Sequence, residues 1–278
     1  MMYLFFLNGS VCILIENSYK GEKMQKNTMK EKMLSGTPVI GPFVNFPSPA
    51  MVEMMGWLGM DFVIIDCEHG STDYESAENM IRAAELSSTS PIVRIGMNIQ
   101  QHIQRFLDAG AQGVLIPLVN NQKDAKNVVN STKYPPLGKR GMFGGRSSMY
   151  AAQSMSEYVK EANEEMMVGL QIETMEGLEN QDEIINTEGA DLIFLGPGDL
   201  SSVFGIHGQM TNPKVQKTIS DMIPKIKSAG KQVGTLVFDG ESAKKWIGEG
   251  VNCLVNSTNR FLSSGTSSYL EEVRKYIK

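Results

Sequence analysis

The sequence contains little cysteine, whose disulfides stabilise many proteins outside reducing compartments. Only three of its 278 residues are cysteine, and Cys12, Cys67 and Cys253 have neither disulfide nor zinc-ligand spacing. We therefore expect free thiols and a cytoplasmic location, because disulfides are rare in the cytosol. A chain of this length buries roughly three quarters of its unfolded surface. It needs no disulfide or structural metal to form a core.

The sequence also lacks runs of basic residues. Its 26 basic and 31 acidic side chains give a formal net charge of −5, so we expect no nucleic acid or membrane partner. The first fifteen residues are apolar but lack the basic start of a signal peptide, and they are shorter than the ~20 residues that span a bilayer. We expect residues 1–26 to be an extension outside the fold and residues 27–278 to form one domain.

Short β-rich runs alternate with segments of helical periodicity from Thr37 onward. Eight runs have the composition of strands: 38–46, 62–67, 91–96, 113–119, 167–173, 191–196, 232–238 and 252–257. Helical spacing is found in 77–86, 99–107, 123–131, 177–186, 213–228, 241–249 and 267–278. Several of these helices end at a glycine, as helices often do.

This alternation predicts the fold class. Eight strand–helix units in one domain close most economically as a (β/α)₈ TIM barrel. The competing doubly wound sheet would require a glycine-rich phosphate loop after the first strand, and residues 41–51 are not such a loop. One connection, residues 132–166, is long and rich in glycine and serine, which is typical of a functional lid or a disordered segment.

Two carboxylates follow neighbouring strands of the predicted barrel. The active sites of such barrels lie at the carboxyl ends of the strands. Glu173 ends the fifth run and Asp199 follows the sixth. Carboxylate oxygens suit Mg²⁺ or Mn²⁺, which keep several water ligands. The alternative is that both residues cap helices or bind surface water.

His69 and Arg94 fall at the same predicted end. His69 follows the second run in Asp66-Cys67-Glu68-His69, where an imidazole suits proton transfer. Arg94 stands inside an otherwise apolar run, so we expect it to pair with Asp66 or Glu68, to hold a developing oxyanion, or both.

The strand ends offer no lysine, which a Schiff-base aldolase would require. A metal ion is therefore the favoured electron sink. GPGDL (196–200) adds small residues before an expected helix start, where backbone N–H groups suit a carboxylate ligand. The sequence thus points to a metal-assisted reaction of a small carboxylic acid.

In order along residues 27–265, the segments DFVIIDCEHG, PIVRIG, DAGAQGVLIPLV, YPPLGKRG, QIET and GADLIFLGPGDLS resemble the motifs of the HpcH/HpaI aldolase family. The resemblance implies a class II aldolase that uses a divalent metal (Mg²⁺, Mn²⁺ or Co²⁺) to cleave or form 4-hydroxy-2-oxo acids of the 2-keto-3-deoxy sugar acid type. The products of cleavage are pyruvate and an aldehyde. It also implies a homo-oligomer, in this family a hexamer, in which a C-terminal helix is exchanged between neighbours.

The resemblance also implies roles for individual residues. Glu173 and Asp199 match the metal ligands, and His69 matches the catalytic base. Asp108 matches an acid that orients this histidine, and Arg94 matches the residue that binds the keto oxygen of pyruvate. Two further matches concern substrate binding, namely Gln171 and the amides of Gly198 and Asp199. The loop after YPPLGKRG differs between members, so the aldehyde is not implied.

Two other functions remain open. A related barrel lyase would act on an acyl-CoA ester, which favours a basic surface that the sequence does not show. A barrel without activity would only bind a 2-oxo acid, although the retained acidic, histidine and arginine residues argue against that. Phosphoenolpyruvate chemistry is a weaker candidate because no basic cluster is present for a phosphate.

Overall fold

The chain forms a closed barrel of parallel strands. The computed structural model describes residues 2–7, 10–15 and 24–277, with side chains from residue 24 onward. All eight predicted runs form strands, namely β3 (Val39–Val44), β4 (Phe62–Asp66), β5 (Ser90–Arg94), β6 (Gly113–Ile116), β7 (Met167–Ile172), β8 (Leu192–Leu195), β9 (Gln232–Leu236) and β10 (Cys253–Ser257). They close in the order β10-β3-β4-β5-β6-β7-β8-β9, which confirms the (β/α)₈ prediction and excludes an open sheet.

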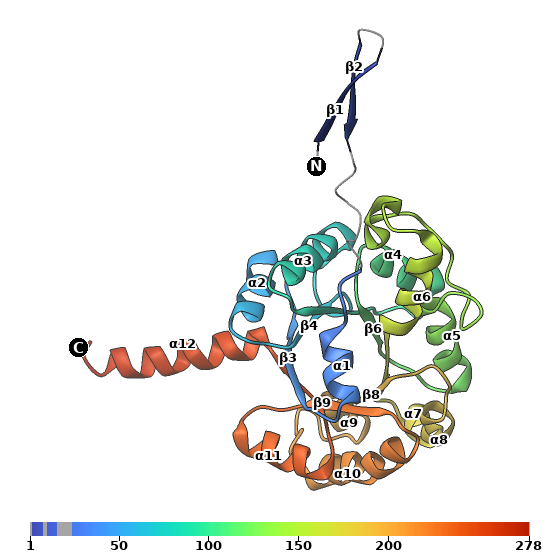
Figure 1. Cartoon of the computed structure of the whole chain (residues 1–278). Coiled ribbons are helices and arrows are strands. Elements are labelled where there is room, and N and C mark those ends of the chain that lie inside the picture. Colours follow the sequence, from blue (N-terminus) through green and yellow to red (C-terminus); the bar gives the residue numbers. More distant parts are fainter. Residues whose placement is uncertain (1, 8–9, 16–23, 278) are drawn as a thin grey trace.

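The predicted helices surround this barrel, apart from the C-terminal helix α12 (Figure 1). They are α3 (Tyr74–Leu86), α4 (Gln100–Asp108), α5 (Gln122–Thr132), α7 (Met175–Glu179), α8 (Gln181–Ile185), α10 (Pro213–Ser228), α11 (Gly240–Glu249) and α12 (Thr258–Arg274). The run 177–186 divides into two short helices, and α12 begins at Thr258 rather than at residue 267. Each predicted helix-terminal glycine has a positive φ: Gly110, Gly189, Gly230 and Gly250. This conformation costs glycine little, which explains its use there.

Three helices and one 3₁₀ segment were not expected from the sequence. They are α1 (Thr28–Leu34), α2 (Pro49–Trp57), η1 (Arg146–Ala151) and α6 (Met155–Glu165). A helix start was expected at GPGDL (196–200), and α9 (Pro197–Val203) begins within that segment. The start of α2 carries a recognisable signal, because the Ser48 side chain accepts from the Met51 amide and a proline follows it. The long connection 132–166 therefore contains η1 and α6 rather than only irregular chain.

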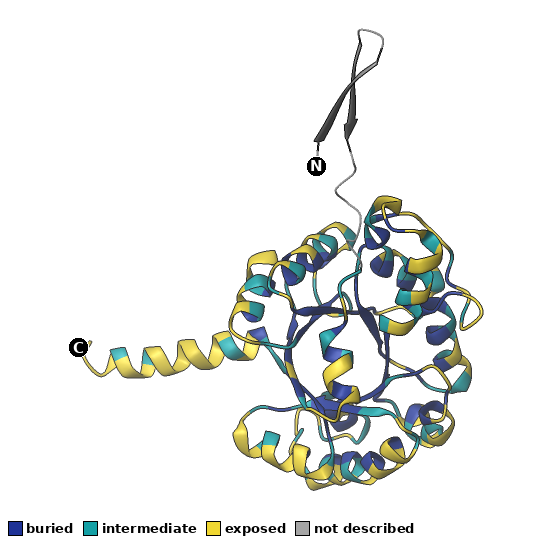
Figure 2. Ribbon diagram, viewed as in Figure 1, coloured by how far each residue is buried: buried dark blue, intermediate teal, exposed yellow. Residues whose placement is uncertain are grey.

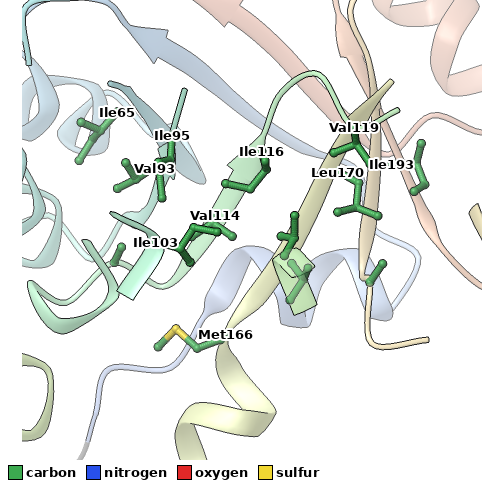
Figure 3. Close-up of a cluster of buried hydrophobic side chains, with 14 of the residues drawn as sticks. Ile65, Val93, Ile95, Ile103, Val114, Ile116, Val119, Met166, Leu170 and Ile193 are labelled. Atoms are coloured by element: carbon green, nitrogen blue, oxygen red, sulfur yellow. The ribbon is translucent and has the colours of Figure 1, made fainter. Parts of the chain in front are cut away.

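The buried side chains form two layers. The interior of the barrel is filled by strand residues such as Phe62, Ile92 and Phe194, and α1 closes its amino-terminal end with the buried Met29 and Met33. A second layer lies between the strands and the outer helices (Figure 3). Burying each side chain of this size is worth about 1.5–3 kcal/mol. These two layers hold the carboxyl-end loops in place.

Contacts with the barrel begin before Asn27. Met24 packs against the outer core layer, and the Gln112 side chain donates to the carbonyls of Gln25 and Lys26 at 3.0 and 3.2 Å. Asn27 is fully buried, and its side chain donates to the Gln112 carbonyl at 2.9 Å. Upstream, β1 (Met2–Leu7) and β2 (Ser10–Ile15) pair as an antiparallel hairpin.

The C-terminal helix α12 departs from the barrel (Figure 1). Most of its side chains are exposed along its whole length (Figure 2). Within the described residues, no helix combines the length and apolarity that crossing a membrane would take. Cys67 and Cys253 are free thiols, and the side chain of Cys12 lies outside the described residues.

Candidate active site

Parallel strands bring the loops that follow them to one end of the barrel. These loops carry His69 after β4, Glu173 after β7 and Asp199 in the first turn of α9 after β8, while Arg94 is the last residue of β5. Gln171 is a buried residue of β7. The structure therefore places these five predicted site residues at the same end, although their roles remain predictions.

Arg94 is held by a fully buried acid. Its Nε donates to Asp66 Oδ1 at 2.9 Å and its Nη2 to Asp66 Oδ2 at 2.6 Å. Burial tends to raise the pKa of Asp66, but the bonds and charge of Arg94 and the backbone amides of Glu68 and His69 outweigh it and lower the pKa. Asp66 is therefore ionised, and the donors of Arg94 that remain can face a substrate.

Glu68 lies between Arg94 and His69. Its Oε2 is 3.3 Å from Arg94 Nε and 3.5 Å from His69 Nε2. Burial is the main cause that raises the pKa of Glu68; the charges of Arg94 and His69 oppose it, while those of Asp66 and Asp199 add to it. The His69 side chain is 63% exposed, so it is open to water and to substrate.

Glu173 is a buried carboxylate held by two donors. The Leu118 amide donates to Glu173 Oε1 at 3.0 Å, and the Gln171 side-chain amide donates to Oε2. Burial, joined by the charge of Asp199, raises the pKa of Glu173 to about 7 despite the two hydrogen bonds. Asp199 itself is exposed on the first turn of α9. A buried acid whose pKa is raised by a neighbouring acid is typical of a functional site.

These residues fit a hard divalent cation. The two carboxylates offer only oxygen ligands, which such cations prefer. A side chain at position 196 would place its Cβ 2.9 Å from Glu173 Oε2, so Gly196 keeps that oxygen accessible. Gln171 Oε1 is buried without a hydrogen-bond partner. Among the described residues, no group of three histidine, cysteine or acidic side chains could hold a metal. A cation here would complete its shell with water or substrate oxygens, as Mg²⁺ commonly does.

Asp108 lies at the opposite end of the barrel from His69. It is the last residue of α4, just before the amino end of β6, whereas His69 follows the carboxyl end of β4. Its Oδ1 accepts from the buried Arg140 Nη2 at 2.7 Å. Burial raises the pKa of Asp108 although Arg140 opposes this shift. Orienting His69, the role implied by the resemblance, would require the Asp108 of another copy of the chain.

The other two histidines differ in their surroundings. His102 Nδ1 is hydrogen-bonded to the Tyr74 hydroxyl, and the His102 ring stacks on the Tyr74 ring. His207 is exposed in the loop after α9. Neither histidine lies at the cluster of Glu173 and Arg94.

Three further residues support the site. Asn45, after β3, donates to Asp66 Oδ2 at 2.7 Å, and the Arg94 guanidinium lies 4.3 Å from the centre of the Phe43 ring. Leu118 orients Glu173 through its backbone, so its residue type carries no signal. Asn45 had a sequence signal, since it is a polar residue directly after a strand.

Comparison with known proteins identifies the family. The model of the HpcH/HpaI aldolase/citrate lyase family matches residues 40–259. A 4-hydroxy-2-oxo-heptane-1,7-dioate aldolase of Salmonella dublin is 34% identical over 222 residues, which cover 80% of this chain and 84% of the relative. The protein of that name in Klebsiella pneumoniae is also 34% identical, over 80% of this chain and 83% of its own.

Solved structures give the same result. An HpcH/HpaI aldolase/citrate lyase family protein from Burkholderia cenocepacia has a TM-score of 0.83 at 28% identity, covering 89% of this chain and 99% of its own. The citrate synthase SbnG has a TM-score of 0.82 at 29% identity, covering 91% of this chain and 100% of its own.

Proposed function

Because the chain belongs to the HpcH/HpaI aldolase/citrate lyase family of carbon–carbon lyases, we propose that it is a metal-dependent class II aldolase. Its substrate would be a 4-hydroxy-2-oxo acid of the 2-keto-3-deoxy sugar acid type, cleaved to pyruvate and an aldehyde or formed from them. The observation that carries the proposal is the buried Glu173, with a pKa of about 7, beside Asp199 at the carboxyl end of the barrel.

The side chains of the site suit each step of the cleavage. His69 takes the proton of the C4 hydroxyl, directly or through water, and the C3–C4 bond breaks. The C4 half leaves as an aldehyde, and the bonding electrons stay on the other half as pyruvate enolate. Arg94, fixed by Asp66, stabilises the negative enolate oxygen. His69 then returns its proton to C3, which gives pyruvate.

The remaining residues hold the 2-oxo acid. Glu173 and Asp199 would bind Mg²⁺, Mn²⁺ or Co²⁺, which when bound supplies a Lewis acid for the carboxylate and keto oxygens of the substrate. Gln171 and the Leu118 amide keep the Glu173 carboxylate in one orientation. The amides of Gly198 and Asp199 lie in the first turn of α9, where helix amides have no intrahelical acceptor, and they would bind the substrate carboxylate.

Exchange of the pyruvate methyl protons with deuterated water tests this function without knowledge of the aldehyde. We expect metal-dependent exchange, its loss after treatment with a chelator, and its return with Mn²⁺ or Mg²⁺. Full exchange by chelator-stripped protein would contradict the metal assignment, and no exchange with either metal would contradict the aldolase. A screen with glyoxylate, glycolaldehyde, lactaldehyde, succinic semialdehyde and tartronate semialdehyde would then identify the acceptor.

A lyase or synthase acting on an acyl-CoA ester is the second candidate. It is favoured by the structural similarity to the citrate synthase SbnG. We rank it lower because the loops after β5, β6 and β7 (95–99, 117–121 and 173–174) contain no lysine or arginine that could bind a nucleotide. Condensation of acetyl-CoA with a 2-oxo acid, without proton exchange into pyruvate alone, would favour this candidate.

The departing α12 supports a homo-oligomer. A (β/α)₈ barrel needs an outer helix over each strand, yet α12 projects away from the body (Figure 1). Ile40 on β3 and Trp57 on α2 are 50% and 70% exposed, and Leu262 and Tyr269 on α12 are 49% and 65% exposed. We therefore propose that α12 covers the barrel of a second copy, as in the hexamers that the resemblance implies.

The oligomeric state in solution tests the role of α12. Replacing Leu262 and Tyr269 by aspartate should lower the molecular mass measured by light scattering, because charged residues would face an apolar surface. Aspartate at the exposed Ser264 serves as the control and should leave the mass unchanged. A wild-type monomer, or an oligomer insensitive to the double substitution, would contradict the proposal.

A further inference from the structure

Leu118 has a backbone conformation that its side chain disfavours. It lies two residues after β6 and has a φ of 54°, in the left-handed region. Glycine adopts this conformation freely, whereas a residue with a Cβ does so at a cost. The Leu118 side chain is also 52% exposed, so little packing within the chain compensates for that cost. Such strain tends to persist at binding and catalytic sites.

The strained residue lies directly beside the acidic pair. Its N–H donates to Glu173 Oε1 at 3.0 Å, which places the Leu118 backbone in contact with a proposed metal ligand. The next amide, of Val119, donates to the Gln171 carbonyl at 3.3 Å. The turn after β6 is thus fixed to β7. Glycine at position 118 would supply the same N–H without the strain, so the backbone bond does not explain the leucine.

The neighbouring loops form an apolar sector of the barrel rim. Met97, after β5, is 52% exposed and Met175, after β7, is 48% exposed, and these loops flank the one that carries Leu118. The three loops, 95–99, 117–121 and 173–174, contain no lysine or arginine. The other sector, formed by the loops after β4 and β8, carries His69 and Asp199.

We propose that Leu118 determines the specificity for the acceptor aldehyde. Its side chain forms an apolar wall beside Glu173, against which the carbon chain of a neutral aldehyde packs. Binding of the aldehyde buries the exposed leucine, which explains why a strained position keeps a large apolar side chain. The absence of a cation in the three loops favours a neutral aldehyde over one with a second carboxylate. This inference rests on the proposed aldolase function.

The test compares two aldehydes that differ by one methyl group. Leu118→Gly and Leu118→Asn are assayed with pyruvate and either lactaldehyde or glycolaldehyde, and each rate is divided by the pyruvate proton exchange of the same variant. A methyl group in an apolar pocket changes kcat/KM by about 10-fold or more. We expect the preference for lactaldehyde over glycolaldehyde to fall by about 10-fold in both variants.

Ser88→Gly is the matched control. Ser88 has the same φ of 54°, is exposed, and lies after α3 at the other end of the barrel. The substitution removes the same kind of strain and should leave the ratio of the two aldehydes unchanged. Both glycine variants should melt no lower than wild type. Asparagine tolerates the left-handed region, so Leu118→Asn keeps the turn while making the wall polar.

Two results would overturn the inference. An unchanged aldehyde ratio in both Leu118 variants would show that the side chain does not contact the acceptor. A fall in pyruvate exchange as large as the fall with lactaldehyde would show that Leu118 acts only through Glu173. Failure of the wild type to exchange pyruvate protons would instead overturn the proposed function, and this inference with it.

Discussion

The two ends of the barrel differ in how they place their acids. At the amino-terminal end, the buried Lys133 donates to the carbonyls of Asn163 and Met166, each at 2.7 Å, and Arg140 pairs with Asp108. The carboxyl end also contains an ion pair, between Arg94 and Asp66, but there the buried Glu173 interacts in addition with another acid, Asp199. Ion pairs thus occur at both ends, whereas the carboxyl end also keeps two acids close together.

This difference separates stability from function. The carboxyl end carries a carboxylate with a raised pKa, a left-handed leucine and an exposed histidine. The amino-terminal end is closed by α1. Features that lower the stability of the folded chain persist where a ligand compensates for them. Substitutions at the two ends should therefore affect activity and stability in different proportions.

Glu173→Gln should have the largest effect. The variant keeps the shape of the side chain but loses a proposed metal ligand, and a bound metal is worth several kcal/mol to the transition state. We expect pyruvate proton exchange to fall by more than about 10³-fold. Thermal stability of the metal-free protein should not fall, because the unfavourable charge next to Asp199 is removed. A variant that loses stability but keeps its activity would contradict the functional assignment of this end.

His69→Ala should come next. Positioned acids and bases contribute about 10²–10⁴-fold, and the exposed imidazole makes only an ion-pair contact with Glu68 among the acids of the described residues. We expect aldol cleavage to fall by at least about 10²-fold while the melting temperature stays constant. His207→Ala, which removes an exposed histidine of the rim, is the control. Cleavage near the wild-type rate would show that another group is the base.

Asp66→Asn and Asp108→Asn test the ion pairs of the two ends. Each removes the charge of the acid that is hydrogen-bonded to a buried arginine, which lowers the unfolding free energy by up to about 3–5 kcal/mol. In Asp66→Asn, Arg94 keeps its longer contact with Glu68. Asp66→Asn should also abolish activity, because Arg94 loses its orientation. The resemblance implies the same for Asp108 through a second copy of the chain. If folded Asp108→Asn keeps the wild-type turnover, Asp108 acts only as the ion-pair partner of Arg140 and not in catalysis.

The unfolding free energy that is lost in Asp66→Asn also depends on pH. Its pKa is lower in the folded state than in the unfolded state, so its contribution is complete above the ordinary value near 3.8. That contribution should disappear as the pH falls through the folded pKa. Unfolding curves of wild type and Asp66→Asn should therefore converge as the pH falls below the folded pKa of Asp66.

Lys133 should have the smallest effect. Burial, together with the charge of Lys30, lowers its pKa to about 8 from the ordinary value of 10.5. The unfolded state therefore binds more protons between these values, and stability rises with pH there. We compare the free energies of unfolding of wild type and Lys133→Met, measured with denaturant from pH 7.5 to 10.5. The difference between them should shift in favour of wild type by up to about 3 kcal/mol as the pH rises. A constant difference would contradict the lowered pKa.

The barrel could be predicted because its signals are local. Every strand is a short apolar run, and Gly110, Gly189, Gly230 and Gly250 end helices where a left-handed residue is needed. The short helices α1 and α2 were missed because they hold too few residues to show periodicity. The polar helix α6 was missed because a glycine-rich connection precedes it.

The candidate site could likewise be predicted only in part. His69, Arg94, Glu173 and Asp199 could be placed at one end because the carboxyl ends of parallel strands meet there. The pairing of Arg94 with Asp66 was expected from an arginine in an apolar strand. The pairing of Asp108 with the buried Arg140 was not expected, because the resemblance names only a role for this acid.

The sequence by itself determined the strands, the barrel and the identity of the acids and bases at its carboxyl end, since each depends on spacing along the chain. Only the tertiary structure decided the raised pKa of Glu173, the left-handed turn at Leu118 and the departure of α12. The physical reason is that these features arise from contacts between residues distant in sequence, whose energies no local pattern records.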